Sequence, residues 1–515
     1  MMDQLIFKKK RPVKPCIHVR VAIGLIAAAA LLSLSACSVP SLTQAPQTAA
    51  PAVPAQWLAS ESAKTMEQGA AMNTGSSAVS STWWQGFGDN GLNQWVALTA
   101  KNNNDLLAAA ARLQEARANL AIAGAAAMPQ LSATGAASAG RSLGARGLTQ
   151  SQSLQPGLQA SWELDLWGRI EHLRQAADLR AQASAADRDA VALAVAATTT
   201  QAYLGLRSLQ AQLALARSTV KSREDALRLA NDQVRVGYIS HLQQSQAQAE
   251  LEGVRQTVEQ LSLALERQRL ALLQLAGGPG DAEALALLKS SIDTSSATGL
   301  QLGTRQFQQL KVPGTPALGL PSQLLERRPD IARAQWQLAA ADQSLAAQRA
   351  AFLPQVNLSA SVGSLLINAL DYNPATLWSL GGSILAPLFT GGRLQGQFDV
   401  ATAQRDQAAY AYRAVVTKAL GEVENALLGE RWLQTQLAHA SERAKVLERT
   451  LGFAKDRYEA GYASYLEELD AQRNLFSAQQ EVIRLRQAQL ENAIALYQAL
   501  GGGWTADGAA ASGQR

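Results

Sequence analysis

The sequence predicts a mainly α-helical fold that also contains β-strands of membrane-spanning length, in an internally duplicated chain. Three observations lead to this fold class: long proline-free runs in which apolar residues recur every three or four positions, short runs with a two-residue alternation, and motifs that recur at a constant offset. With 515 residues, 47% of them hydrophobic and 17% charged, the chain is long enough for several structural modules.

Three pairs of motifs reveal the duplication. They are MPQL at 128–131 with LPQV at 353–356, VGYIS at 236–240 with AGYAS at 460–464, and LLQLAGG at 272–278 with LYQALGG at 496–502. The offset along the chain is the same for all three pairs to within one residue, and the order is kept. We therefore expect two structural repeats, 81–284 and 327–504, joined by a linker at 285–326. Each repeat should consist of a helix, a β-hairpin and a long helical hairpin.

Four runs alternate between apolar and other residues with a period of two, which is typical of strands with one apolar and one polar face. Their apolar-face positions are Leu131, Ala133, Gly135, Ala137 and Ala139; Leu154, Pro156, Leu158, Ala160, Trp162, Leu164 and Leu166; Val356, Leu358, Ala360 and Val362; and Trp378, Leu380, Gly382, Ile384 and Ala386. Each run approaches the roughly 9 to 11 residues that a tilted strand needs to cross a bilayer. Two hairpins of a soluble sandwich would alternate in the same way.

Four strands cannot close a barrel, because an open edge in lipid leaves backbone donors and acceptors unpaired at a cost of several kcal/mol each. If these strands span a membrane, several copies of the chain must share one barrel. Two copies would supply eight strands and three copies twelve, and the small alternating residues do not choose between these numbers.

Two long runs, 169–236 and 393–460, contain no proline and are each bounded by glycines. At 1.5 Å per residue, a helix over either run would be about 100 Å long. Apolar residues follow a heptad in both runs, interrupted by Arg223 in the first, which indicates neighbouring helices wound around each other.

Shorter return helices are expected at 241–276 and 465–500. Helices at 102–126 and 329–352, stacked end to end with the return helices, would nearly match the long ones in length. A coiled-coil spacer without a channel is one interpretation. The helices lack a single broad apolar face, however, and a sheet of helices curved into a tube satisfies narrow stripes on two sides of each helix.

The first 36 residues resemble a bacterial signal peptide, with a cationic stretch that ends at Arg20 and an apolar run at 21–36. Leu34-Ser35-Ala36-Cys37 resembles the lipobox of bacterial lipoproteins, so we expect a lipid on Cys37, although an ordinary secretory signal could carry a chance cysteine. Ser38 stands where an aspartate would resemble an inner-membrane retention signal, which favours the outer membrane. Residues 37–80 read as an extended, lipid-anchored tether and 505–515 as a flexible tail.

Charge and motifs argue against several function classes. Six of the 46 basic and one of the 41 acidic residues lie in the first 36, which leaves 40 of each and gives no reason to expect nucleic-acid binding. HExxH, CxxC and GxxxxGK motifs are absent from the mature sequence. Glu467 with Asp470 could form an acid–base pair, but carboxylates on an exposed helix are far more often solvated or structural. We expect no enzyme, no cofactor and no metal site.

Five segments together resemble the outer-membrane efflux lipoproteins of the TolC and OprM type. They are WWQGFGDNGLNQWVALTAKNNNDLLAAAARLQEAR, WELDLWGR, APLFTGGR, YEAGYASYLEELDAQRNLFSAQQ and ALYQALGGGW. The resemblance covers nearly everything from Trp83 to Trp504. It implies a homotrimer whose twelve-stranded β-barrel is continuous with a twelve-helix periplasmic α-barrel, with the inter-repeat linker in an equatorial region.

The same resemblance implies that the protein is the exit duct of a tripartite efflux system. Its partners would be outer-membrane lipid, a periplasmic adaptor (membrane fusion) protein and an inner-membrane transporter of the resistance-nodulation-division class. A duct for type I secretion and a non-channel coiled-coil scaffold are the alternatives.

The resemblance also places the docking sites for the adaptor at two helical tips. Their candidate residues are Arg235, Gly237 and Ser240 in the first repeat and Arg457, Gly461 and Ser464 in the second. Glycine can adopt the left-handed conformation that ends one helix, and serine can cap the next, so each tip should be a tight helical hairpin. A turn alone explains the glycine and serine, but not the aromatic residue that follows in each tip.

A periplasmic gate is expected at the start of the second return helix, where one repeat carries acidic residues and the other carries Gln243 and Gln246. By resemblance, Leu466 and Asp470 are the constriction residues. Tyr458, Glu467 and Arg473 are candidates for the polar network that holds the end closed. Solvated acids near a helix N-terminus, favoured by the helix dipole, are the simpler interpretation of the same residues.

Overall fold

The computed structural model describes residues 39–58, 79–144, 147–291, 307–314, 316, 320–367 and 374–505. Two compact units are present. The first comprises Met1–Ala45, Leu120–Ala177 and Ala340–Asp406, and the second comprises Pro46–Asn119, Asp178–Ala339 and Gln407–Arg515. The expected signal peptide, Cys37 and the tail beyond Thr505 lie outside the described residues.

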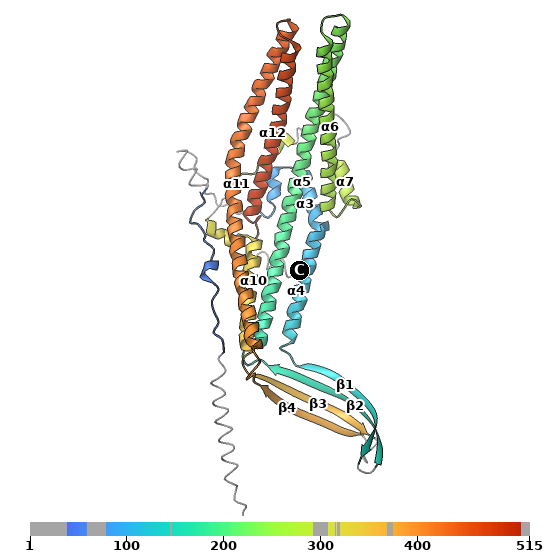
Figure 1. Cartoon of the computed structure of the whole chain (residues 1–515), viewed down its shortest axis with the longest axis vertical. Coiled ribbons are helices and arrows are strands. Elements are labelled where there is room, and N and C mark those ends of the chain that lie inside the picture. Colours follow the sequence, from blue (N-terminus) through green and yellow to red (C-terminus); the bar gives the residue numbers. More distant parts are fainter. Residues whose placement is uncertain are drawn as a thin grey trace, which may run out of the picture. The chain divides into compact units, whose positions relative to one another are not determined.

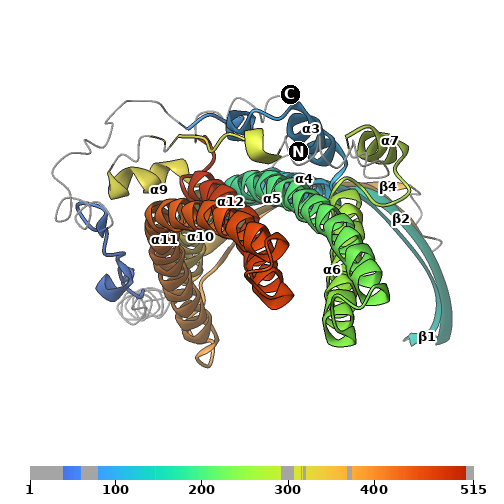
Figure 2. The same cartoon turned by 90° about the horizontal axis from the view of Figure 1, so that it is seen from above.

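Four long helices dominate the chain. They are α5 (Arg169–Arg235), α6 (His241–Leu275), α11 (Arg393–Glu459) and α12 (Tyr465–Ala499). Figures 1 and 2 show α6 alongside α5 and α12 alongside α11, so each pair forms a helical hairpin. The predicted long helices and return helices are therefore confirmed, with ends within one residue of those expected.

The shorter helices precede the strands or connect the repeats. They are η1 (Gln47–Ala49), η2 (Trp83–Phe87), α3 (Asn90–Asn102), α4 (Asn104–Ala125), α7 (Ala282–Ser291), η3 (Pro321–Gln323), α9 (Leu324–Arg327) and α10 (Pro329–Ala350). The helix expected at 102–126 in fact begins at Asn104, because Asn103 is extended and caps α4. Its Oδ1 accepts the backbone N–H groups of Asp105 and Leu106 at 3.0 and 3.1 Å.

The return helices end where the pre-strand helices begin, in both repeats. The side-chain amide of Asn103, just before α4, donates to the carbonyl of Leu275 at the end of α6 at 3.0 Å. The guanidinium of Arg328, just before α10, donates to the carbonyl of Ala499 at the end of α12 at 2.9 Å. These contacts satisfy carbonyls that a helix end leaves without a partner. They agree with the end-to-end stacking expected from the lengths of the helices.

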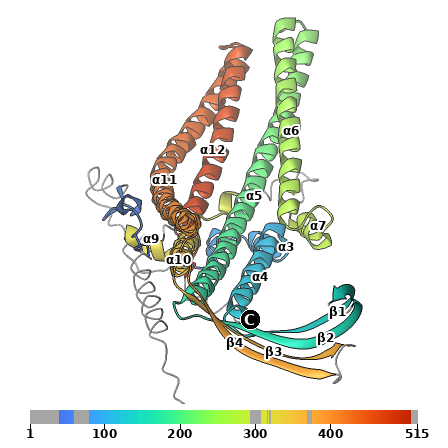
Figure 3. The same ribbon diagram turned by 60° about the horizontal axis from the view of Figure 1, so that its bottom comes forward.

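The first unit contains one antiparallel sheet in the order β1-β2-β3-β4, which Figures 1 and 3 show as a single curved layer. Its strands are β1 (Gln130–Gly144), β2 (Gly147–Leu164), β3 (Gln355–Ile367) and β4 (Ala375–Leu385). β2 pairs with β3, so the hairpins of the two repeats lie next to each other. β1 and β4 are the outer strands, and neither has a second partner in the described part of the chain.

The register sorts apolar and polar residues onto opposite faces of the sheet. One row across the four strands is Ala133, Leu158, Val362 and Trp378, all exposed. The next row is Ser132, Gln159, Ser361 and Ser379. Because paired residues in an antiparallel sheet share a face, the alternation seen in each strand becomes one apolar face and one polar face.

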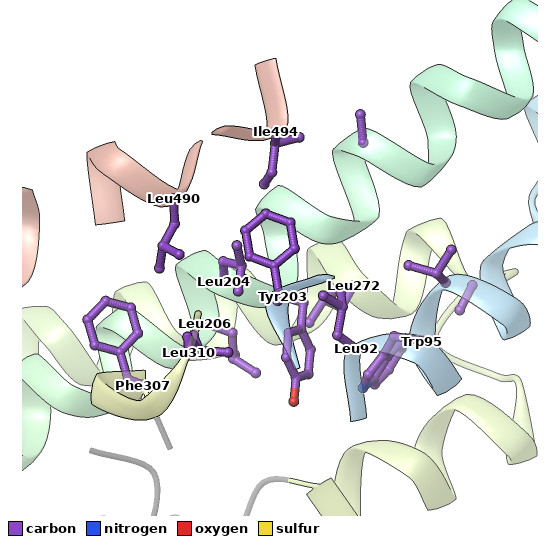
Figure 4. Close-up of a cluster of buried hydrophobic side chains, with 14 of the residues drawn as sticks. Leu92, Trp95, Tyr203, Leu204, Leu206, Leu272, Phe307, Leu310, Leu490 and Ile494 are labelled. Carbon is purple, nitrogen blue, oxygen red and sulfur yellow. The ribbon is translucent and has the colours of Figure 1, made fainter. Parts of the chain in front are cut away.

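The main core of the second unit packs around the middle of α5. Figure 4 shows Tyr203 and Leu206 of α5 with Trp95 of α3 and Leu272 of α6, all fully buried. Leu490 and Ile494 of α12 join the same cluster, as does Phe307 from the segment between the repeats. Burying apolar surface stabilises the folded state by about 25 cal/mol per Å². We therefore expect this cluster to contribute most of the free energy that holds the helical hairpins together. The sequence did not indicate α3 or α7 as separate helices.

The described part of the N-terminal segment lies against the helices. Trp57 is 4% exposed and packs in a cluster with Ile331, Val416 and Leu496. Nearby, Arg413 donates to the carbonyl of Thr48. The expected tether is thus docked against the helices over 46–58, a feature that its lack of apolar periodicity does not indicate. No helix among the described residues is both long and apolar enough to span a bilayer.

Candidate functional site

The first helical tip ends α5 with two backbone hydrogen bonds that define a Schellman motif. Gly237, at φ 75°, donates to the carbonyl of Val234 at 2.9 Å, and Tyr238 donates to that of Gln233 at 2.8 Å. A residue with a Cβ is disfavoured at this φ, which explains the glycine. Ser240 starts α6 in a capping box, since its backbone N–H donates to Oε1 of Gln243 at 3.1 Å.

The second tip repeats the Schellman motif. Gly461, at φ 77°, donates to the carbonyl of Tyr458 at 3.0 Å, and Tyr462 donates to that of Arg457 at 2.8 Å. The tight hairpins expected from glycine are therefore present in both repeats.

Ser464 occupies the N-cap position of α12, as expected, but its side chain makes no capping hydrogen bond. Position three beyond the cap carries Glu467, and its carboxylate pairs with the guanidinium of Arg457 at 3.1 Å. In the first tip the equivalent side chain, Gln243, completes the capping box. Glu467, one of the two acids that distinguish the second repeat, therefore forms an ion pair within its own hairpin.

Both tips present aromatic and apolar side chains to solvent. Tyr238 is 72% exposed and Tyr462 is 81% exposed, and Val236 is exposed beside the first of them. Arg235 pairs with Asp232 at 3.2 Å on the exposed surface of its own helix. Exposed apolar surface rimmed by charge is a common feature of protein–protein contact sites.

Tyr458 links the two hairpins. Its hydroxyl donates to Oε1 of Gln233 on α5 at 3.0 Å, and its ring lies 5.7 Å from that of Tyr465 at the start of α12. Tyr465 is buried together with Leu469 in a small apolar cluster that includes Ala247 of α6. Burial raises the pKa of the Tyr458 hydroxyl, so this group stays a neutral donor at physiological pH.

Arg473 forms a second link, by donating from its guanidinium to the carboxylate of Glu250 on α6. This hydrogen bond raises the pKa of Arg473, so the residue is a permanent cation. Glu468, five residues earlier on α12, is half-buried, and desolvation raises its pKa. The second hairpin therefore makes a polar contact with each helix of the first, from Tyr458 of α11 to α5 and from Arg473 of α12 to α6.

Leu466 and Asp470 lie one turn apart on α12 and are both exposed, Leu466 at 52%. The side-chain amide of Asn474 donates to Asp470 at 3.1 Å. Of the five candidate gate residues, Tyr458, Glu467 and Arg473 are thus held in contacts between or within the hairpins. Leu466 and Asp470 instead present an apolar and an acidic side chain to the space beside the helix.

Sequence reasoning missed the partners of this network. Gln233 and Glu250 sit among many other polar residues of α5 and α6 and carry no distinguishing pattern. Arg223 did give a signal, because it interrupts an apolar heptad, and it is 4% exposed. Within the described residues, no group of three or more His, Cys, Asp or Glu side chains could hold a metal ion.

Comparison with known proteins identifies the family. The sequence profile of the outer membrane efflux protein family matches residues 95–278 and again residues 320–502. This chain belongs to the outer membrane efflux protein family. The second match begins after the first by the same offset that separates MPQL at 128–131 from LPQV at 353–356.

Relatives of known role span nearly the whole protein. The chain is 34% identical to the pyoverdine export outer membrane protein OpmQ of Pseudomonas aeruginosa over 82% of its own length and 88% of that protein. It is 33% identical to the toluene efflux pump outer membrane protein TtgC of Pseudomonas putida, over 83% of this chain and 86% of that protein. It is 30% identical to the cation efflux system protein CusC of Escherichia coli, over 92% of this chain and 97% of that protein.

Solved structures have the same fold as this outer membrane efflux protein. The open state of the MtrE outer membrane channel of Neisseria gonorrhoeae is 28% identical, with a TM-score of 0.73 over 90% of this chain and 98% of that one. A structure of CusC is 27% identical, with a TM-score of 0.74 over 90% and 99%. The chain is therefore an outer-membrane efflux channel protein with a helix-rich fold.

Proposed function

We propose that three copies of the chain form one exit duct, with a twelve-stranded β-barrel in the outer membrane and a twelve-helix α-barrel in the periplasm. The sheet carries this proposal. It combines a continuous apolar face, a polar face and two outer strands without a second partner in the described chain. Strands of neighbouring copies would pair with β1 and β4 and so provide hydrogen-bond partners for backbone groups that would otherwise be unpaired in lipid.

The choice of three copies draws on the likeness to solved channels of this family. Twelve strands and a polar inner face suit an aqueous passage. In this arrangement Trp378 and Leu158 face lipid, whereas Ser361 and Gln159 face the lumen.

Cross-linking tests the barrel. Single cysteines at Ser132 on β1 and, in turn, at Leu377, Ser379, Gly381 and Ser383 on β4 are introduced into a background that retains Cys37. Oxidation should produce a covalent trimer for one or two of the β4 positions and not for the others. Monomers at every position, together with no conductance in planar bilayers, would refute the shared barrel and favour the coiled-coil scaffold.

The duct is proposed to work with a periplasmic adaptor protein and an inner-membrane transporter of the resistance-nodulation-division class. The exposed tips support this part of the proposal, since Tyr238 and Tyr462 follow the glycines of two tight turns and are exposed. Arg235, Ser240, Arg457 and Ser464 complete the proposed docking surface. Titrating the solubilised trimer, and its tyrosine-to-serine tip variants, with a purified periplasmic adaptor protein tests this contact directly.

The cargo is proposed to be set by the inner-membrane transporter. The names of the related proteins above refer to export of pyoverdine, of toluene and of cations. Relatives of similar sequence thus belong to systems with chemically different cargo, which argues against selection by the channel walls. Susceptibility of a deletion strain to solvents, metal ions and antibiotics, with complementation, identifies the cargo class.

The closed end of the duct is proposed to lie at the start of α12. Leu466 and Asp470 would form rings around a threefold axis, and Tyr458, Glu467 and Arg473 would hold the helices in place. Lipid attachment at Cys37 is proposed to add an anchor beside the barrel.

A further inference from the structure

Arg223 occupies a core position between helices, where the heptad calls for an apolar residue. It lies between Val220 and Leu227 in the three-four spacing that continues to Ala230 and Val234. Its side chain is buried, at 4% exposure. When the two repeats are aligned on their tip motifs, the equivalent position of the second repeat is Leu447. The charge at this core position is therefore a feature of one repeat only.

The buried charge of the Arg223 guanidinium has few interactions that offset its loss of hydration. Its Nε has no hydrogen-bond partner among the described residues. Two carboxylates are near enough to attract it, Glu250 and Glu468, but Glu250 accepts from Arg473 and Glu468 accepts from Gln472. Neither acid forms an ion pair with Arg223 in the described chain, and Arg473 adds a repelling charge.

The electrostatic balance of this site is unfavourable to the charge. Burial lowers the pKa of Arg223, and the attraction of Tyr465, Glu250 and Glu468 does not offset it. Arginine nevertheless remains protonated at physiological pH. A depressed pKa for a base means that the charged form is disfavoured in the packed state, so the packed state itself carries the free-energy cost.

Three side chains that interact electrostatically with Arg223 come from α12. Tyr465, Glu468 and Arg473 all belong to its first nine residues, which also contain the proposed gate. Tyr465 also packs in one cluster with Ala230 of α5, two turns beyond Arg223, so displacement of this end of α12 would loosen the packing near Arg223 and admit water. A buried unpaired charge then gains hydration, whereas an apolar residue at the same position would lose its packing.

We propose that Arg223 is a positioning residue of the gate, whose buried charge opposes close packing of α12 on α5 and holds the duct near the balance between closed and open. The inference rests on the proposed gate at the start of α12. It predicts that an apolar residue at position 223 keeps the duct shut.

The test uses the full-length trimer in planar bilayers and in hydrogen exchange. Arg223→Leu, which copies the residue of the second repeat, should reduce the open fraction about tenfold, as expected when a buried charge is replaced by a packed apolar side chain. Exchange of amides in 223–236 and 465–473 should slow by a similar factor. Arg223→Lys should stay near the parent because it keeps the charge.

The matched control is Arg228→Leu, the same chemical change at an exposed position of the same helix. It should leave both measurements unchanged. Amides around Tyr203 provide an internal check that each variant is folded. Faster exchange or a larger open fraction in Arg223→Leu would mean that Arg223 holds the end closed, and unchanged values would mean that it has no role in the balance. Either result overturns the proposal.

Failure of the gate proposal is distinguishable from failure of this inference. If Leu466→Ser combined with Asp470→Ala does not raise conductance, the constriction is elsewhere. The exchange measurement on Arg223→Leu still decides whether Arg223 opposes the packing of α12. If the double variant opens the duct and Arg223→Leu does not close it, only the inference about Arg223 fails.

Discussion

Asn492 of α12 donates its side-chain amide to the backbone carbonyl of Ala426 on α11, at 2.8 Å. The first repeat contains the same contact, because Gln268 of α6 donates to the carbonyl of Ala202 on α5, also at 2.8 Å. The two contacts occupy equivalent positions when the repeats are aligned on their tip motifs, and so do the glycines that follow the two carbonyls, Gly205 and Gly429. A glycine at this position lets an amide side chain reach the backbone of the facing helix.

Replacing these glycines should have different consequences in the two repeats. A Cβ at Gly429 would lie 2.1 Å from Oδ1 of Asn492, whereas at Gly205 it would lie 3.3 Å from Nε2 of Gln268. Gly429→Ala must therefore displace Asn492 and break its hydrogen bond, which outweighs the gain in helix propensity. We expect Gly429→Ala to be less stable than Gly205→Ala by about 1 to 3 kcal/mol.

Denaturant unfolding of the trimer, followed by helical circular dichroism, measures this difference. Asn492→Leu should lose a similar amount of stability without any change at the glycine. A Gly429→Ala variant as stable as Gly205→Ala would show that the contact contributes nothing to the packing of α12 on α11.

The sequence predicted the long elements because their signals are local and repeated. Gly168 and Gly237 bracket the first long helix, and both have positive φ, so the expected ends match α5. The strand faces could be predicted since a period of two sorts residues without knowledge of partners. By contrast, the pairing of β2 with β3 joins segments from different repeats, and no local pattern specifies it.

The parts that could not be predicted depend on tertiary contacts. Asn103 ends one helix and caps the next, and its side-chain amide also donates to the carbonyl of Leu275, which is far away along the chain. No local pattern reveals that partner. Trp57 lies in an alanine- and proline-rich segment without apolar periodicity, and it packs with residues of α10, α11 and α12. At the candidate site the turns followed from glycine, but the ion pair between Glu467 and Arg457 joins residues on either side of the turn, and no local pattern specifies it.

Cys37→Ser should abolish lipid attachment, because the acceptor thiol is removed, while the β-barrel still holds the protein in the outer membrane. Metabolic labelling with palmitate, followed by membrane fractionation, measures both effects. Cys16→Ser is the matched control, since this cysteine lies within the expected signal peptide and should leave labelling intact. Palmitate incorporation into Cys37→Ser would contradict lipidation at Cys37.

Leucine at Gly237 or Gly461 should impair efflux with little loss of trimer. Both glycines have positive φ, which costs a residue with a Cβ about 1 to 2 kcal/mol, and both lie at the exposed tips. Drug susceptibility and gel mobility of the unheated trimer measure the two effects. Gly452→Leu within α11 is the control, because Gly452 has ordinary φ and open space around it in the chain. Full resistance in both tip variants would argue against docking at these turns.

Asp470→Ala combined with Leu466→Ser should open the duct. Threefold symmetry turns each residue into a ring, and removing three apolar side chains and three carboxylates widens the passage and lowers its preference for cations. We expect a several-fold rise in single-channel conductance, a smaller potassium-to-chloride permeability ratio, and entry of vancomycin into cells. The control is Leu242→Ser with Gln246→Ala, the same two positions in the first repeat. If Asp470 only favours the helix N-terminus through the dipole, the double variant will lose some helix stability and conduct like the parent. That result would place the closure of the duct elsewhere.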